Sequence, residues 1–349
     1  ATHAWASAGG HAEGATLTST SGAITVRGTS PDTPGVVVQG GTVTSVTGPV
    51  TIHGIGERIG GTLITGSAIH SDSGDIRITG VGGSYEVSGQ DGAVQNIGYG
   101  VLLGDSTNVS SGTGDIQVAG HVNAPADGLD LGACVYRGTE STRRTTNGGL
   151  IEVTCSASNG APGVFLSDWE GDVWPAVIEG SGVVVLRAAS DAATDALQIG
   201  GEVSAGTVLN LRPGAVSSTG VAADRVSDVI TLGGTAATGF AVSQDEFSRI
   251  TAPTIVAGST MHAANIDVVG ALGLGATTTA LTLQNDAGGG IHLGAPLSLA
   301  TVGLSSRWAL PPISLTIPPA SRTSSTPAAM SQGFRPVSQY PSSRPAATK

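Results

Sequence analysis

The stretch SDWEGDVWP holds the densest set of chemically capable side chains in the chain. Its carboxylates are Asp168, Glu170 and Asp172, and its two indole rings are those of Trp169 and Trp174. Carboxylate oxygens suit a calcium ion, and aromatic rings with a few polar groups are typical of ligand sites. Carboxylate pairs also act as acid and base in glycoside hydrolysis. The composition therefore indicates a sugar platform, a calcium site or a hydrolytic centre.

The same stretch also has a purely structural interpretation. Acidic residues keep an exposed loop hydrated, and tryptophan can cover the edge of a neighbouring strand. No further catalytic groups accompany Asp168, Glu170 and Asp172 in a recognisable order. We therefore expect a loop inserted between strands that binds a ligand at most, with no catalysis, no metal and no cofactor.

Other polar residues with possible chemistry are scattered along the chain. Asp75 and Asp115 each follow a glycine in two copies of one phrase, which favours a role in stabilising turns over a role as ligands. His53 and His70 fall at outward or turn positions, where we expect them to face water.

The chain has only two cysteines, Cys134 and Cys155. They are either two small buried apolar side chains or a single disulfide that closes off an insertion. Without histidines at a suitable spacing, two cysteines do not indicate a metal site.

Composition and charge exclude several classes of function. The chain carries 26 Asp and Glu against 15 Lys and Arg, a net charge of −11, which argues against a nucleic-acid partner because phosphate binding needs clustered basic residues. No window of 18 apolar residues occurs, so insertion into a membrane is not expected. GxSxG, HExxH, P-loop and CxxC motifs are all absent.

The elements that must position these residues are short repeated strands. A phrase of the type Gly-x-Ile-x-Val recurs with decreasing fidelity, with steps of 26, 26, 40, 35, 33 and 25 residues between equivalent positions. Alternation places the two apolar residues on one face and the polar residue on the other. The equivalent residues are Ile24, Val50, Ile76, Ile116, Ile151, Val184 and Leu209.

A second phrase lies between copies of the first, with paired apolar runs such as 36–38 and 43, or 101–103 and 109. Each unit of about 26 residues therefore holds two or three short strands joined at glycine corners. One unit cannot bury its apolar pairs alone, whereas stacked units can. We predict an all-β chain that forms a single-stranded right-handed parallel β-helix of roughly 10–13 rungs, about 50–60 Å long.

Three segments follow from this interpretation. Residues 1–14 are expected to be an N-terminal cap or linker, and 15–305 the β-helix. The tail 306–349 is rich in Pro and Ser and loses the alternation, so we expect it to be disordered.

The aligned phrases resemble the repeats of filamentous-haemagglutinin-like exoproteins of Gram-negative bacteria. The resemblance lies in copies such as Gly114-Asp-Ile116-Gln-Val118 and in the run from Gln244 to Gly258. It implies a β-helical rod, secreted or held at the cell surface, that acts in adhesion, aggregation or biofilm contact. The Asn-Pro-Asn motif of the secretion domain is missing, which suggests a middle or distal portion.

Two functions follow as hypotheses. The first is an extracellular adhesin rod without catalysis, which contacts a surface glycan or protein of a host or neighbouring cell through loops inserted between rungs. Its secretion would involve an outer-membrane transporter, and its loops would be 168–174, then 85–99 and 136–146, where aromatic residues gather. The alternative is a carbohydrate-active β-helix enzyme, a polysaccharide lyase or glycoside hydrolase, that uses the 168–174 loop.

Overall fold

The computed structural model describes residues 3–8, 10–83, 85–88, 94–123, 133–137, 143–158, 161–166, 176–190, 195–234, 239–298 and 303–307. The chain divides into two units, Ala1–Ala309 and Leu310–Lys349. Every described residue belongs to the first unit. The predicted disordered tail was 306–349; its first two residues, Ser306 and Arg307, instead end the strand Gly303–Arg307, and the disorder of 308–349, outside this description, stays a prediction.

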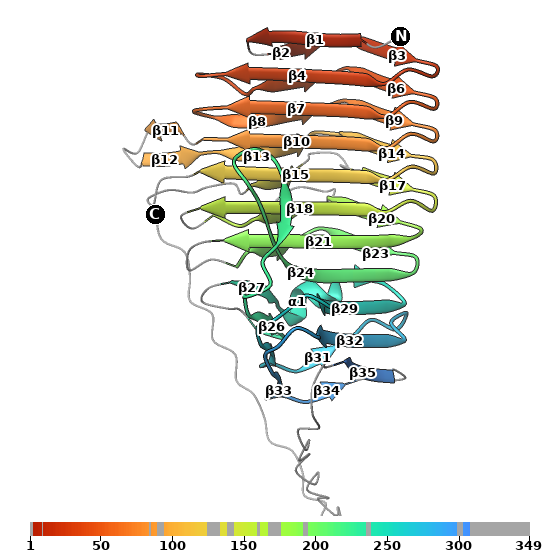
Figure 1. Cartoon of the computed structure of the whole chain (residues 1–349), viewed down its shortest axis with the longest axis vertical. Helices are drawn as coiled ribbons and strands as arrows, with labels where there is room; N and C mark the ends of the chain where they lie inside the picture. Colours follow the sequence, from red (N-terminus) through yellow and green to blue (C-terminus); the bar gives the residue numbers. More distant parts are fainter. Residues whose placement is uncertain are drawn as a thin grey trace, which may run out of the picture. The chain divides into compact units, whose positions relative to one another are not determined.

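The first unit is a parallel β-helix, as the repeats predict (Figure 1). Each complete coil contributes one strand to each of three parallel sheets, which we name sheets A, B and C. Sheet A consists of β1 (His3–Ala8), β4 (Ile24–Ser30), β7 (Val50–Gly56), β10 (Ile76–Gly82), β15 (Ile116–Asn123), β18 (Ile151–Ser158), β21 (Val183–Ser190), β24 (Val208–Val216), β29 (Thr254–Ser259), β32 (Ala280–Asn285) and β35 (Gly303–Arg307).

The other two sheets are shorter. Sheet B consists of β2 (Gly10–Glu13), β5 (Val36–Gln39), β8 (Gly60–Thr65), β13 (Tyr99–Gly104), β16 (Cys134–Arg137), β19 (Val164–Leu166) and β22 (Leu197–Ile199). Sheet C consists of β3 (Thr16–Ser19), β6 (Thr42–Ser45), β9 (Ala68–Ser71), β14 (Asn108–Ser111), β17 (Arg143–Thr146), β20 (Val177–Gly180), β23 (Glu202–Ala205) and β28 (Ile250–Thr251). The segment 1–14 thus supplies β1 and β2, which pair in parallel with β4 and β5.

The register of sheet A confirms the alignment of the repeats. Ile76 pairs with Ile116, and Ile116 pairs with Ile151. All three side chains are fully buried, since parallel stacking brings equivalent apolar residues of successive coils together inside the solenoid. The same column contains Ile24, Val50, Val184 and Leu209.

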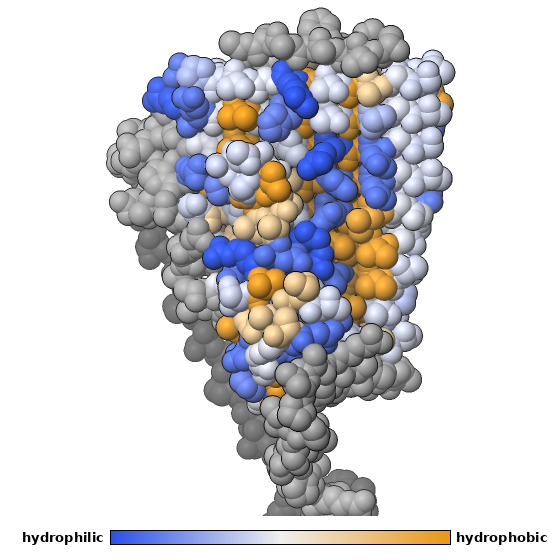
Figure 2. All heavy atoms as spheres, in the orientation of Figure 1, coloured by the Kyte–Doolittle hydropathy of each residue, from blue (hydrophilic) through white to orange (hydrophobic). Residues whose placement is uncertain are grey.

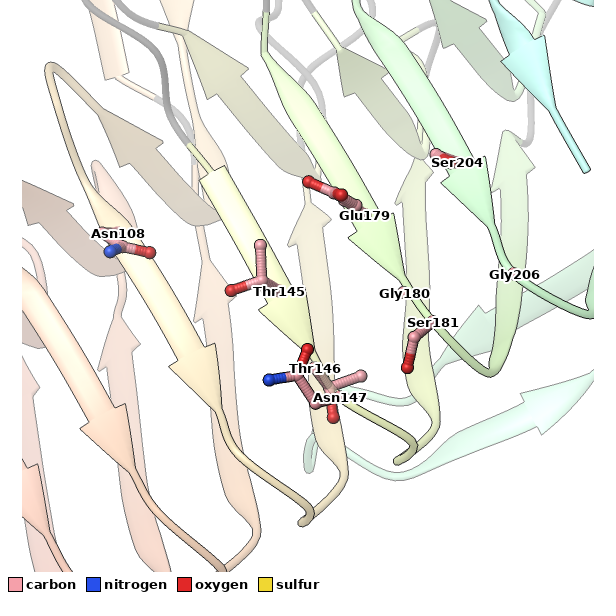
Figure 3. Close-up of a pocket in the computed structure, with 9 residues that line it drawn as sticks. All are labelled: Asn108, Thr145, Thr146, Asn147, Glu179, Gly180, Ser181, Ser204 and Gly206. Carbon is pink, nitrogen blue, oxygen red and sulfur yellow. The ribbon is translucent and has the colours of Figure 1, made fainter.

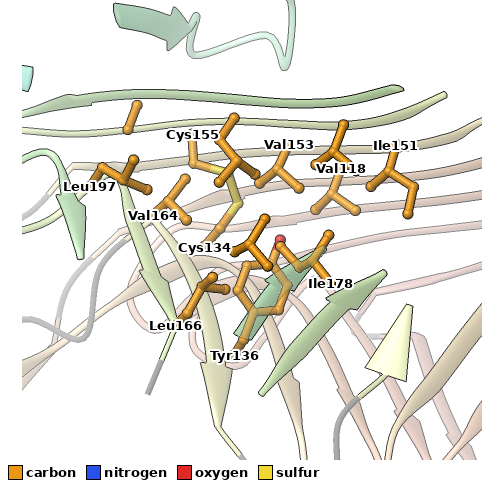
Figure 4. Packing of buried hydrophobic residues seen from close by; sticks show 14 of the residues in the cluster. Val118, Cys134, Tyr136, Ile151, Val153, Cys155, Val164, Leu166, Ile178 and Leu197 are labelled. Atoms are coloured by element: carbon orange, nitrogen blue, oxygen red, sulfur yellow. A yellow bond between two sulfur atoms is a disulfide. The ribbon is translucent and has the colours of Figure 1, made fainter. Parts of the chain in front are cut away.

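A column of small residues in sheet A lies directly against sheet B. Gly80 pairs with Gly120, and Gly120 pairs with Cys155 in the next coil. A Cβ atom added at Gly80 would overlap the carbonyl of Gly100 in sheet B, so only glycine fits there. At Cys155 the column carries a sulfur, which forms a disulfide with Cys134 of sheet B (Figure 4). The disulfide thus joins two sheets inside the core, across 21 residues of sequence.

The corners after sheet C repeat a hydroxyl bond. The Ser45 hydroxyl accepts the Gly48 N–H at 3.0 Å, and one coil later the Ser71 hydroxyl accepts the Gly74 N–H at 2.9 Å. Both serines are fully buried. The Ser-x-x-Gly spacing therefore satisfies a turn donor within each coil.

The C-terminal coils depart from the three-sheet pattern. After β24, four strands form a separate parallel sheet with the order β27 (Phe240–Val242), β26 (Ile230–Leu232), β30 (Ile266–Val268) and β33 (Ile291–Leu293). Strands β31 (Leu272–Gly273) and β34 (Leu297–Ser298) also pair. Helix α1 (Gln244–Ser248) is capped by Ser243, whose side chain accepts the Glu246 N–H while the Glu246 carboxylate accepts the Ser243 N–H. Among the described residues no helix has the length and hydropathy to span a membrane.

Candidate functional site

The predicted binding loop, 168–174, falls in a part of the chain that the structure does not describe. Asp168, Trp169, Glu170, Asp172 and Trp174 all lie within 167–175, outside the described residues, between β19 and β20. Their proposed role in ligand binding therefore stays a prediction.

The other two predicted loops are corrected in part. The first contains an antiparallel hairpin of β11 (Tyr85–Ser88) and β12 (Val94–Ile97). Its last tyrosine, Tyr99, and the first residue of the other loop, Tyr136, are buried strand residues of sheet B. Burial raises the pKa of the Tyr99 hydroxyl above its usual range. These two rings contribute to the core and are not available to a ligand.

The recurring aspartates stabilise corners between coils. The Asp75 carboxylate accepts the Asp115 N–H at 2.9 Å, and the Asp115 carboxylate accepts the Leu150 N–H at 2.8 Å. Each aspartate thus bonds the corner of the next coil and not its own turn. In the described part of the chain, no group of three or more His, Cys, Asp or Glu could hold a metal ion.

A polar groove of about 460 Å³ crosses the outer face of sheet C (Figure 3). Thr145, Glu179 and Ser204 occupy one column on three successive strands, and Asn108 comes from the strand before them. The groove is lined by Asn108, Thr145, Thr146, Asn147, Glu179, Gly180, Ser181, Ser204 and Gly206. Its lining offers hydroxyl, amide and carboxylate groups and no large apolar side chain.

The polar column of this groove continues over the rest of sheet C. Ser110 precedes Thr145 in the column, and His70 precedes Ser110, with His70 Nδ1 within 2.8 Å of the Ser110 hydroxyl. The other His70 nitrogen, Nε2, lies 2.7 Å from Asp72 Oδ1. His70 therefore belongs to a hydrogen-bonded row and does not simply face water. Thr18 and Thr44 occupy the same column on two further strands.

A second candidate surface is formed where a hairpin lies across sheet A. We name residues 214–228 the arm; it continues β24, turns at 217–221 and returns as β25 (Ala222–Asp224). Figure 1 shows the arm, in green, passing over β21, β18 and β15. Ser156 of β18 anchors it, since the Ser156 hydroxyl donates to the Val216 carbonyl at 3.0 Å and accepts the Val216 N–H at 2.9 Å.

Paired charges hold the stem of the arm. We name these four residues, Glu152, Arg187, Arg212 and Asp224, the arm base. Arg187 Nη2 lies 2.8 Å from Glu152 Oε1, and Arg187 Nε lies 3.3 Å from Asp224 Oδ1. Arg212 Nε lies 3.4 Å from the same Asp224 oxygen. Burial, and then the charge of Arg187, lowers the pKa of Arg212, while Asp224 and Glu152 oppose that shift. Figure 2 shows hydrophilic residues gathered across the middle of this face.

The other end of the arm closes a groove of about 400 Å³, which we name the tip groove. Its floor is Arg27 of β4, Thr51 and His53 of β7, and Arg77 and Thr79 of β10, and its roof is 219–221. A Cβ atom added at Gly220 would lie 3.7 Å from His53 Cε1, so the tip rests close to that ring.

His53 is half-buried in the tip groove, which corrects its expected exposure to water. Its Nδ1 lies 2.6 Å from the Thr79 hydroxyl. Burial lowers the pKa of His53, and the charges of Arg27 and Arg77 lower it further. The groove lining contains no carboxylate, and neither arginine is ion-paired with any residue that the structure describes.

The sequence gives little sign of the arm, the tip groove or the polar groove of sheet C. The one signal for the tip groove is the outward polar position of the first three repeats. Arg27, His53 and Thr79 align at this position, and Arg77 lies two residues before Thr79. Comparison with protein-family models, curated proteins and solved structures finds no match to this chain.

Proposed function

We propose that this chain is the β-helical rod of an extracellular bacterial adhesin, which holds a surface glycan of a host or neighbouring cell without cleaving it. The observation that supports this most is the polar groove of sheet C. Strands about 4.8 Å apart present Thr145, Glu179 and Ser204 at a regular spacing, which matches a ligand with regularly repeated hydroxyl groups.

The chemistry of the groove favours a sugar over an apolar ligand. Hydroxyl and amide groups donate and accept hydrogen bonds, and the Glu179 carboxylate accepts them from sugar hydroxyls. The groove crosses four strands from β14 to β23, a span of roughly 15 Å, enough for a short stretch of an extended chain. An open polar groove of this kind binds weakly at one site, and several copies on a cell surface would act together.

Two further features support a position outside the cell. The Cys134–Cys155 disulfide is typical of proteins that fold in an oxidising compartment. The coil repeats resemble those of filamentous-haemagglutinin-like exoproteins, which implies a secreted or surface-held rod and an outer-membrane transporter as a partner in secretion.

A glycan array tests this proposal. We expect wild type to bind at least one glycan class, and T145V/S204A to lose most of that binding because the column loses two hydroxyl groups. The matched control is Thr18→Val, which changes the same column outside the groove. Equal binding by wild type and T145V/S204A would remove the groove from the proposal, and release of new reducing ends from the bound glycan would favour the enzyme alternative.

The 168–174 loop is tested in the same assay. If the loop contributes to the binding face, Trp169→Ala and Trp174→Ala weaken binding, since an aromatic ring supplies much of a sugar contact. Unchanged binding by both variants would exclude this loop.

A further inference from the structure

We propose that the tip groove is a second binding site, separate from the groove of sheet C, that takes one phosphate or sulfate ester group on a small ligand. The site consists of the guanidinium groups of Arg27 and Arg77, with His53 between them and the arm tip above. It lies on sheet A and does not depend on the proposed adhesin function.

The placement of the two arginines suits a tetrahedral oxyanion. Arg27 and Arg77 lie on β4 and β10, on either side of β7 and two residues apart in register, so their backbones are about 12 Å apart and their long side chains can reach a common point above His53. A guanidinium group offers two parallel N–H donors, which match the oxygens of a phosphate or sulfate.

The electrostatics of the groove also favour an anion. The chain as a whole carries a charge of −11, yet the lining of this groove contains two arginines, one histidine and no carboxylate. The charges that act on His53 are those of Arg27 and Arg77, and the arm-tip residues 219–221 bring no ionisable side chain. Because burial and the two arginines disfavour the protonated form of His53, the positive charge of the groove is that of Arg27 and Arg77, and a bound anion would compensate it.

The size of the groove limits the ligand. A volume of about 400 Å³ suits a group of small-molecule size. The arm tip, with Gly220 lying against His53, closes one side. Because that side is closed, the groove takes a single esterified group on a small ligand.

Titration calorimetry with four probes tests the proposal. The probes are inorganic sulfate, inorganic phosphate, a phosphorylated monosaccharide and the same monosaccharide without phosphate. We expect the first three to bind and the last to fail. Arg27→Gln and Arg77→Gln should each weaken binding about tenfold, since each removes charge-assisted hydrogen bonds. Both arginines are exposed, so the variants should fold, which circular dichroism can verify.

Arg58→Gln is the matched control, because Arg58 is an exposed arginine of the same coils that pairs with Asp32 outside the groove. Binding should be unchanged in this variant. Equal weakening by R58Q and R27Q would overturn the proposal, because binding would then follow net charge alone. Unchanged binding in R27Q/R77Q, or absence of binding to all three anions, would also overturn it.

The pH dependence separates His53 from the arginines. Sulfate keeps its charge between pH 5 and 8, so any change in its affinity over that range comes from the protein. Protonated His53 adds a third positive charge, and we expect sulfate affinity to rise as the pH falls. His53→Gln should remove that rise and leave affinity near pH 8 almost unchanged. A rise that persists in H53Q would contradict the role of His53.

Discussion

The arm base and the tip groove lie on one face of sheet A under one hairpin. They differ in whether acidic residues compensate their arginines. A single column of this sheet contains three arginines, Arg27 at one end and Arg187 and Arg212 at the other. At the arm base, Asp224 of the arm and Glu152 of the neighbouring strand lie within ion-pair distance of the arginines. At the tip groove the arm brings only Thr219, Gly220 and Val221.

A residue's position in the repeat therefore does not decide its role. An outward arginine that meets an acid becomes part of the fold, because its charge is compensated as it is partly buried. An outward arginine without an acid keeps its donors free for a ligand. The arm determines the outcome, because it places Asp224 beside Arg187 and Arg212 but no acidic residue at the tip groove.

The largest effect is expected when the arm base loses its acid. Asp224→Asn leaves Arg187 and Arg212 close together with only Glu152 to compensate them. We expect the free energy of unfolding to fall by about 3 to 4 kcal/mol, toward the lower end for a broken buried pair because Asp224 is one quarter exposed. Chemical denaturation measures this loss.

The matched control for this change is Asp32→Asn, which breaks the exposed pair with Arg58. That variant should lose at most about 0.5 kcal/mol, as expected for an exposed ion pair. Similar losses in D224N and D32N would mean that the arm base is no more structural than an ordinary surface pair.

A somewhat smaller effect is expected from the disulfide on the inner side of the same sheet. The double variant C134A/C155A should lose about 2 to 3 kcal/mol of unfolding free energy, since the bond closes a loop of 21 residues. Alanine fits this column, because Ala188 follows Cys155 in it. Sulfate affinity at the tip groove should stay unchanged, so this variant separates a loss of global stability from a loss of the site. A parallel loss of affinity would show that the two are not independent.

The smallest effect on stability is expected from pH. The folded pKa of His53 lies below its ordinary 6.5, so the unfolded chain takes up a proton there more readily. Its contribution to stability is present above pH 6.5 and is lost as the pH falls from 6.5 through the folded pKa. The difference in stability between wild type and His53→Gln should therefore shrink or reverse over that window. His262, whose pKa burial also lowers, cancels in this difference. A difference independent of pH would contradict the burial of His53.

The regular coils could be predicted in detail from the sequence. Parallel stacking favours an apolar residue at each inward position of every coil, so the alignment of Ile76 with Ile116 and Ile151 is also their pairing in the sheet. Whether the two cysteines pair could not be predicted, because only the fold brings the strand of Cys134 over the glycine column that ends in Cys155.

The arm could not be predicted in this way. It pairs with itself in antiparallel fashion and reaches sheet A through contacts such as that of Ser156 with Val216, 60 residues apart, so it leaves no repeat in the sequence. Helix α1 does have a local sequence signal, the capping box formed by Ser243 and Glu246. The sequence does not predict the burial of Tyr99 and Tyr136, because an aromatic residue beside an insertion can belong either to the loop or to the strand next to it.

One pair of variants tests the comparison most directly. R27Q/R77Q and R187Q/R212Q each remove two positive charges from the same face of sheet A. The free energy of unfolding is measured for both. We predict that R27Q/R77Q stays within about 0.5 kcal/mol of wild type, while R187Q/R212Q loses about 3 kcal/mol because Glu152 and Asp224 are left unpaired. Equal losses in the two variants would contradict the division of this face into a structural end and a ligand-binding end.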